Sequence, residues 1–518
     1  MPDNHEPSNP AVTGDHSPAP GDTREVPRNT AFFGHPLGLL TLFGTELWER
    51  FSYYGMRAIL LFYLTDTVAK GGLAMEQTSG LALVSIYGTS VYLLSVVGGW
   101  LADRMIGARR SVLYGGIIIA AGHVLLTVPI AASSYLGIAC VALGTGLLKP
   151  NVSSMVGELY DRGDPRRDGA FSIFYMGINL GSLAAPFLVG LARTWGGYHA
   201  GFAVAAVGMA LALIFFVAGR RLLGGAGDTV TNPLQPHEGP AVIRWGVIGV
   251  VVIIALVAAV KLVTQGSLLS TFIDTMSILA FATPVLYFVV MYRSPRVTAH
   301  ERSRVLAYIP LFVTAMIFWM IFEQAATTMA AFAENRTQLN LFGRTLPPEL
   351  FQSINPALIV ILAPVFAGLW VKLKGHPPTA IKFALGLGLA ALSFLFLAGM
   401  SARYADTLAP AWVLGVTYLL QTLGELCLSP VGLAATTLLA PAAFRSQSMA
   451  LWFLAPAAGQ AITAQLVQVT EGTSDSTYFG GIGVVAMIFA IALLTLSPWV
   501  TRHIKAGAET VEEVELES

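Results

Sequence analysis

The stretch Glu46-Leu47-Trp48-Glu49-Arg50-Phe51-Ser52-Tyr53-Tyr54-Gly55 lies inside an otherwise apolar run, about residues 36–64. A run of that length can cross a bilayer as a helix, for which about 20 residues are needed. Charged groups are costly in hydrocarbon unless they are paired or face water. Most of the polar groups share one face of the helix, which carries Glu46, Arg50, Tyr53 and Arg57, flanked by Glu49 and Tyr54. This face is expected to form either a buried ion-pair network or a site for a polar substrate and a proton.

The composition is that of an integral membrane protein. Of 518 residues, 55% are hydrophobic and 12% are charged, and the mean hydropathy is +0.66, whereas soluble domains carry about 25% charged residues. Lys and Arg together number 30, as do Asp and Glu, so the net charge indicates no class of partner. Cys140 and Cys427 both lie in apolar segments, which indicates no disulfide framework.

Apolar runs of spanning length recur in groups of six, two and six. The first six helices are expected at about 36–64, 76–103, 109–131, 135–157, 169–192 and 198–221. Two more are expected at about 241–262 and 271–292, and their low charge predicts that they face lipid. The last six are expected at about 304–333, 354–372, 378–401, 410–438, 446–468 and 478–501.

These groups predict an all-α membrane protein with fourteen transmembrane helices. Two six-helix bundles are expected at 34–223 and 302–503, with two inserted helices at 240–293. Residues 1–33 are expected to form a disordered cytoplasmic tail, because they are rich in Pro, Asp, Asn and Gly. Residues 504–518 are expected to form an acidic cytoplasmic tail.

The basic residues predict the orientation. Most Lys and Arg side chains lie in the tails and in the even-numbered connections, as in the loop that contains Arg104, Arg109 and Arg110. The positive-inside rule then places both termini in the cytoplasm. We therefore expect a multi-pass protein of the inner, cytoplasmic membrane, with the lipid bilayer as its surroundings.

Three further charges lie deep in apolar spans: Lys149, Glu323 and Glu425. With Glu46, Glu49, Arg50 and Arg57, they fall on the first and fourth spans of each set of six. Four carboxylates then face three cations, so one carboxylate is left over and can carry a proton. Charge counting alone thus gives a hypothesis of proton coupling.

Several motifs resemble the proton-dependent oligopeptide transporter family, a branch of the major facilitator superfamily. The charged stretch looks like the signature of its first helix, and Gly99–Arg110 is similar to the loop between helices two and three of the superfamily. Phe171-Ser-Ile-Phe-Tyr-Met-Gly-Ile-Asn-Leu-Gly-Ser182 resembles the signature of its fifth helix. The family's other characteristic positions are matched by Tyr92, Lys149, Glu323, Asn355, Glu425, Trp452 and Phe453.

The resemblance implies the major facilitator fold and a symporter that imports di- and tripeptides with protons by alternating access. The expected proton-coupling residues are Glu46, Glu49, Arg50 and Glu323. The expected substrate-binding residues are Arg50, Tyr54, Tyr92, Lys149, Asn179, Trp319, Glu323, Asn355, Glu425, Trp452 and Phe453. Two pairs on opposite bundles, Arg57 with Glu323 and Lys149 with Glu425, are expected to act as gates.

Other functions stay open at this point. A relative that moves nitrate, an amino acid or a drug is the nearest alternative, and a membrane sensor or an intramembrane enzyme is a more distant one. The sequence shows no metal-ligand cluster, nucleophile constellation, P-loop or appended soluble domain, so we expect no enzyme activity, cofactor, metal or nucleic-acid partner. A monomer is expected to suffice. His123, in the third span and away from the charged helices, is expected to have a packing or helix-contact role.

Overall fold

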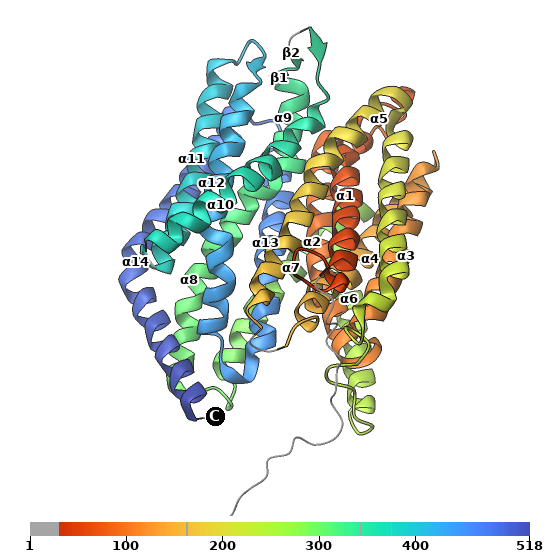
Figure 1. Ribbon diagram of the computed structural model, residues 1–518. Helices are drawn as coiled ribbons and strands as arrows, with labels where there is room; N and C mark the ends of the chain where they lie inside the picture. The colour runs from red at the N-terminus through yellow and green to blue at the C-terminus, as the bar shows by residue number, and fades with distance from the viewer. Residues whose placement is uncertain (1–30, 162–163, 342, 374–375, 518) are drawn as a thin grey trace, which may run out of the picture.

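Long helices that run roughly alongside one another make up the computed structural model, which describes residues 31–161, 164–341, 343–373 and 376–517 (Figure 1). The first group contains α1 (Leu37–Thr65), α2 (Gln77–Leu101), α3 (Ala108–Thr127), α4 (Ala131–Glu158) and α5 (Arg166–Ala218). Next come α6 (Gly239–Thr264) and α7 (Leu268–Arg293). The last group contains α8 (Ala299–Phe322), α9 (Thr328–Arg336), α10 (Ile354–Lys372), α11 (Thr379–Arg403), α12 (Trp412–Leu439), α13 (Arg445–Val469) and α14 (Asp475–Glu517).

Short elements connect these helices. The short helices are η1 (Val68–Lys70), η2 (Ala102–Ile106), η3 (Gly219–Leu223), η4 (Glu323–Ala326), η5 (Pro348–Ser353) and η6 (Ala442–Phe444). Strand β1 (Thr337–Gln338) pairs in parallel with β4 (Ala409–Pro410), and β2 (Asn340–Leu341) pairs antiparallel with β3 (Arg344–Thr345). We call the end of the molecule that carries these strands the strand end, and the opposite end, where α14 finishes, the terminal end (Figure 1).

The number of membrane spans agrees with the prediction. Within the described residues, twelve helical segments are long and apolar enough to cross a membrane. One of them covers residues 166–223 and contains two spans, because α5 is bent at Gly197, whose φ of 75° suits glycine. Helix α1 has 29 residues and adds a further span despite its charges. The total is therefore the expected fourteen.

Each group of helices buries its own apolar core. Leu39, Phe62 and Phe202 are among the fully buried side chains of the first core, which α1–α5 dominate. Phe318, Phe383 and Phe394 are fully buried in the second core, formed largely by α8–α14. Two separate cores are what two bundles need in order to move against each other as units.

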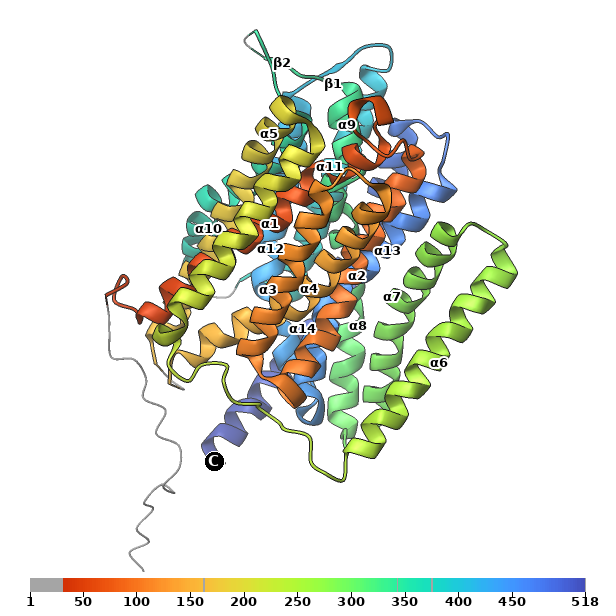
Figure 2. The same cartoon turned by 90° about the vertical axis from the view of Figure 1, so that its right-hand side faces the viewer.

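The inserted helices differ from each other, and the expectation that both simply face lipid is wrong for α7. Helix α6 buries only Val260, and it lies at the edge of the molecule (Figure 2). Helix α7 packs against α2 and α13, and its Asp274 and Ser277 accept hydrogen bonds from Gln465 at 3.1 and 3.0 Å. The hairpin is thus attached to the bundles through one helix.

The single helix expected at 304–333 is broken. Helix α8 begins with a capping box, in which Thr298 and Glu301 satisfy each other's backbone N–H groups. It ends at Phe322, the chain continues as η4 from Glu323, and α9 resumes at Thr328. The break places Glu323 at a helix end in the middle of the molecule. Helix α14 runs to Glu517, beyond the expected 501, and residues 1–30 of the expected tail lie outside the described part.

Candidate functional site

One guanidinium holds two carboxylates on α1. Arg50 Nε lies 2.5 Å from Glu49 Oε2 and 3.1 Å from Glu46 Oε1, and all three side chains are almost fully buried. Three of their atoms are buried without a hydrogen-bond partner: Arg50 Nη2, Glu46 Oε2 and Glu49 Oε1. The helical spacing of four residues brings Glu46 under Arg50, as the sequence predicted. The group keeps one guanidinium arm and two carboxylate oxygens for other contacts.

A second guanidinium on α1 connects the two bundles. Arg57 forms an ion pair with Glu323, and its Nη2 also donates to the Glu323 carbonyl oxygen at 3.3 Å. This carbonyl is accessible because the helix breaks at Glu323. Tyr92 donates its hydroxyl to Glu323 Oε1 at 3.4 Å. The expected pair of Arg57 and Glu323 is therefore formed in this conformation.

Lys149 has a ring rather than a carboxylate beside its ammonium. Its Nζ lies 3.9 Å from the centre of the Tyr92 ring, a cation–π distance. No ion pair joins Lys149 to any residue in the described ranges. It is close enough to Glu46, Glu49, Arg50 and Glu323 to interact with their charges over a longer distance. The expected gate with Glu425 is not formed in this conformation.

Glu425, on α12, is held by an amide instead of a cation. Asn355 Nδ2 donates to Glu425 Oε2 at 3.0 Å and is also 3.0 Å from Thr422 Oγ1. Glu425 is buried, and no ion pair involves it within the described part of the chain. Tyr54 is near enough to interact electrostatically with Arg50, Glu323 and Glu425 alike. Tyr54 is therefore near charged groups of both bundles.

Asn179 and Trp319 lie on the opposed helices α5 and α8. Asn179 Nδ2 donates to the carbonyl of Tyr175 in the same helix at 2.9 Å. This hydrogen bond does not use the side-chain oxygen of Asn179. Trp319 packs edge-on against Phe318 and Phe322, and its Nε1 is buried without a hydrogen-bond partner. Both residues thus keep one polar atom that a ligand can satisfy.

The aromatic pair on α13 is not part of this group. Trp452 is buried in the second core beside Phe383, at a ring distance of 6.1 Å, and covers Gly432 so closely that any side chain there would clash. Phe453 is 42% exposed and borders a cavity of about 590 Å³ near the terminal end, together with Trp100. The substrate-binding role expected for Trp452 and Phe453 stays a prediction.

His123 does contact the charged helix, contrary to the expectation that it lies away from it. Its Nε2 lies 2.6 Å from Ser52 Oγ, and both side chains are fully buried. The contact joins α3 to α1 at Ser52, which is two residues after Arg50 in the chain. A helix-contact role is what this geometry indicates.

Sequence reasoning missed an ion-pair network at the strand end. Arg193 binds Glu349 with both arms, from Nε to Oε1 at 2.8 Å and from Nη2 to Oε2 at 2.9 Å. Tyr198 joins Arg193 at 3.3 Å to Asp66 at 3.0 Å. Burial alone would raise the pKa of Asp66, but hydrogen bonds from the Thr67 amide, Tyr198 and Lys70 lower it. No local pattern marks this network, since its two main partners lie 156 residues apart.

The two bundles also meet along a seam between α2 and α13. Thr89 Oγ1 donates to the carbonyl of Ala457 at 3.1 Å. The buried side chain of Gln460 lies directly over Gly88, where a Cβ would be 1.7 Å from its Oε1. A side chain at residue 88 would therefore displace the Gln460 amide from the seam.

The arrangement suits a small ligand that carries both charges. In the described part of the chain, Arg50 has a guanidinium nitrogen without a hydrogen-bond partner, and Lys149 has no carboxylate beside its ammonium, so both can bind an anion. Glu425 is, in the same part, a carboxylate without a cation beside it. The described residues contain no group of three or more His, Cys, Asp or Glu that could hold a metal ion. The groups can bind and exchange protons, but they form no nucleophile–base arrangement of a hydrolase.

Comparisons with known proteins agree with this chemistry. A model of the POT family matches residues 109–491. The chain is 48% identical to an uncharacterized transporter of Bacillus subtilis (93% of this chain, 97% of the relative), and 43% identical to a di-/tripeptide transporter of Lactococcus lactis subsp. cremoris (90% and 96%). The crystal structure of the peptide transporter POT in complex with sulfate matches with a TM-score of 0.88 and 52% identity, over 92% of this chain and 97% of that one.

Proposed function

The chain belongs to the POT family, and from this premise we propose that it imports di- and tripeptides together with protons by alternating access. The family consists of transporters, so no enzyme activity is involved. We place the protein in the cytoplasmic membrane, with the terminal end and both termini in the cytoplasm, because basic residues gather at that end. A monomer contains the whole site.

One observation carries the choice of substrate: complementary charges remain unpaired on opposite bundles. Lys149 and the free arm of Arg50 lie on the first bundle, while Glu425 lies on the second. A peptide carboxylate fits the two cations, and a peptide ammonium fits Glu425. Nitrate has no ammonium group and would leave Glu425 without a partner, so the geometry favours a zwitterion over a simple anion.

Proton coupling has its own physical basis. Glu46 and Glu49 share Arg50, and each keeps a buried oxygen without a partner. Binding a peptide carboxylate at Arg50 would compete with these carboxylates, and a proton on one of them relieves the competition. Protonation of Glu323 would likewise weaken its ion pair with Arg57, which joins the bundles. Substrate and proton therefore act on the same few charges.

The gates are proposed to alternate. At the strand end the bundles are joined by Arg193 with Glu349, and by Ser353 Oγ, which donates to the Leu183 carbonyl at 2.9 Å. Lys149 and Glu425 are apart. We take this conformation as closed to the outside. When the bundles at 34–223 and 302–503 turn so that the strand end opens, Lys149 and Glu425 would come together. A bound peptide shifts this balance only if it stabilises one state more.

Uptake into liposomes tests the proposal. The purified protein, reconstituted with an acidic outside, should accumulate radiolabelled dialanine above its external concentration, and a proton ionophore should abolish the accumulation. The Glu425→Ala variant should need at least about tenfold more dialanine for half-maximal uptake, the effect of losing one charge-assisted contact. Accumulation of labelled nitrate instead of dialanine would overturn the assignment.

A further inference from the structure

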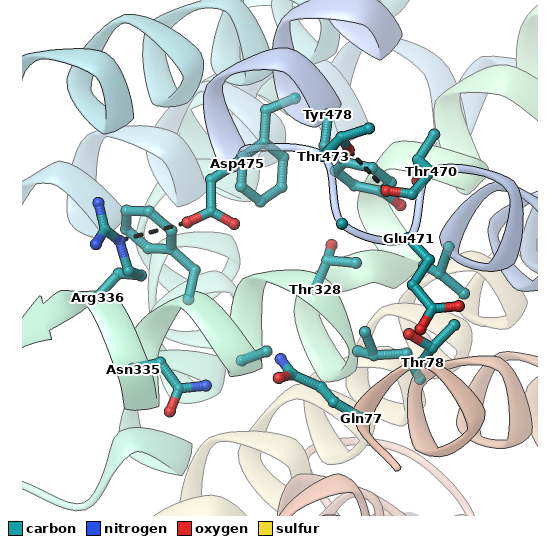
Figure 3. Close-up of a pocket in the computed structure, with 16 residues that line it drawn as sticks. Gln77, Thr78, Thr328, Asn335, Arg336, Thr470, Glu471, Thr473, Asp475 and Tyr478 are labelled. Atoms are coloured by element: carbon teal, nitrogen blue, oxygen red, sulfur yellow. Dashed lines mark hydrogen bonds and ion pairs between the residues drawn. The ribbon is translucent and has the colours of Figure 1, made fainter. Parts of the chain in front are cut away.

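A separate cavity of about 420 Å³ opens at the strand end (Figure 3). Helix α2 of the first bundle lines one side, and α9, α13 and α14 of the second bundle line the rest. None of the charged residues described above belongs to its lining. Its size falls in the usual range for small-molecule sites, about 300–1,000 Å³.

One end of this strand-end cavity carries a guanidinium. Arg336 Nε lies 3.4 Å from Asp475 Oδ2, but this nitrogen is buried and makes no hydrogen bond (Figure 3). The side chains of the pair are 33% and 43% exposed, and an exposed pair of this kind contributes at most about 1 kcal/mol. A ligand carboxylate could therefore replace or join Asp475 at little cost.

The other end carries two carboxylates that face each other across the bundles. Glu471, which follows α13, lines the cavity, and Glu76, directly before α2, lies beside it outside the lining; both side chains are exposed. Their hydrogen bond and their mutual repulsion raise the pKa of Glu471. Two carboxylates that are close enough to share a hydrogen bond attract a cation, since a positive charge relieves their repulsion.

Between the two ends lie side-chain amides. Gln77 and Asn335 point into the cavity between Arg336 and Glu471, and neither makes a side-chain hydrogen bond within the described residues (Figure 3). An amide can both donate to and accept from a peptide bond. Thr328, on the same helix as Asn335, and Tyr478, on α14, are already bonded to Gln324 at 2.6 and 3.0 Å.

We propose that the strand-end cavity is a second binding site for a short zwitterionic peptide, with the carboxylate at Arg336 and the ammonium between Glu76 and Glu471. The order of charges along the cavity matches the two ends of a dipeptide, and the amides match its backbone. The choice of ligand rests on the proposed transport function. The site itself lies on the outer side and is formed while the bundles are closed there.

Equilibrium dialysis of the full chain with radiolabelled dialanine tests this site. The Lys149→Ala/Glu425→Ala variant removes the cation and the carboxylate that have no ion-pair partner among the described residues in the site between the bundles, which we call the central site. Binding that remains in this variant should belong to the strand-end cavity. In this background Glu471→Gln should weaken binding at least about tenfold, as expected for a lost charge pair. Asp406→Asn, an exposed carboxylate near the same end of the molecule, is the matched control and should change nothing.

Modified probes locate the two ends of the peptide. N-acetyl-dialanine lacks the ammonium and dialanine amide lacks the carboxylate, so both should compete poorly with dialanine. The amide probe is preferable to an Arg336 variant, because Arg336 Nη2 also donates to the carbonyls of Tyr404 and Ala405. Equal competition by the three compounds would overturn the proposed orientation and with it the site.

If the double variant does not fold, the number of dialanine molecules bound per wild-type protein is measured instead. The wild type should bind two dialanine molecules and its Glu471→Gln variant one. One molecule bound by both overturns the second site, even when uptake into liposomes is normal. Conversely, strand-end binding without uptake would contradict only the transport function.

Discussion

Lys149 Nζ lies 3.9 Å from the centre of the Tyr92 ring, and the hydroxyl of the same tyrosine donates to Glu323 on the other bundle. Tyr92 thus contacts a cation of the first bundle with its face and a carboxylate of the second with its edge. The ring holds the ammonium without neutralising it, which leaves Lys149 able to bind a carboxylate. A proton-coupled peptide transporter needs such a cation between turnovers.

Replacing Tyr92 separates these two contacts. Tyr92→Phe keeps the ring face and should change dialanine affinity by less than about threefold, whereas Tyr92→Leu should weaken it about 2- to 30-fold, the range of a cation–π contact. Dialysis in the Glu471→Gln background measures the central site alone. Equal affinities of the two variants would show that the ring face does not hold Lys149.

Arg50→Lys should reduce proton-driven uptake to the background of empty liposomes. A lysine places one point charge where Arg50 contacts both Glu46 and Glu49 and keeps a free arm. Uptake of labelled dialanine under an imposed pH gradient is the measurement. Lys372→Arg, at the terminal end of α10, is the control for surface charge. Wild-type uptake by Arg50→Lys would remove this residue from the site.

Coupling and binding should separate in the carboxylate variants. Glu46→Gln and Glu49→Gln should exchange labelled for unlabelled dialanine between two compartments, yet fail to concentrate it, because the proton site is lost while Arg50 remains. Glu323→Gln should also lose accumulation, since its ion pair with Arg57 no longer responds to a proton. If exchange is lost together with accumulation, these carboxylates bind the peptide or hold the fold.

Glu349→Gln should favour conformations that are open at the strand end. Glu349 is fully buried and bound by both arms of Arg193, and removing one partner of such a pair costs on the order of 3–5 kcal/mol. Spin labels at the exposed residues Trp195 and Arg344, in a variant without native cysteines, would report the distance between the bundles. The distribution should shift to longer distances. Asp406→Asn is the control, and an unchanged distribution in Glu349→Gln would show that the Arg193 and Glu349 ion pair does not hold the strand end closed.

Binding in the strand-end cavity should depend on pH. The hydrogen bond with Glu76 and the repulsion between the two carboxylates raise the pKa of Glu471, so acidification protonates this pair before isolated glutamates. The pair is fully charged above that pKa and loses a negative charge below it, so the peptide ammonium should bind more weakly as pH falls. Dialysis of Lys149→Ala/Glu425→Ala between about pH 6.5 and pH 4.5, where dialanine keeps both its ammonium and its carboxylate, measures the effect. Tighter binding at low pH would contradict the charge assignment.

The ion pair on α1 could be predicted because it depends on local geometry. Helical spacing alone brings Glu46 and Arg50 together, and apolar surroundings require the charges to pair. The Arg57 and Glu323 pair followed from charges at equivalent spans of opposed bundles. The number of spans followed from the length and composition of the apolar runs. Each of these features follows from the residues of one stretch or one helix, so it can be predicted without knowing how the helices pack.

Other features depend on packing that one sequence does not reveal. Trp452 belongs to a conspicuous aromatic pair, but its neighbours Gly432 and Phe383 place it in the core. The break at Glu323 lies in a run that is apolar on both sides, so hydropathy predicts one continuous helix. Arg193 and Glu349 were missed because each lies near a predicted loop, and only tertiary structure brings them together.

The position of α7 explains how two extra helices can be accommodated in the middle of a chain whose halves must move. Helix α7 packs against both α2 and α13, the helices that form the seam at Gly88 and Gln460. If the bundles turn about this seam, the inserted hairpin lies near the axis of rotation, where displacement is smallest. The insertion then adds little resistance to the transport cycle. A cross-link made by a short bifunctional thiol reagent between cysteines at Ser277 and Gln465 should accordingly leave uptake intact, and a block of uptake would show that α7 slides along α13 during transport.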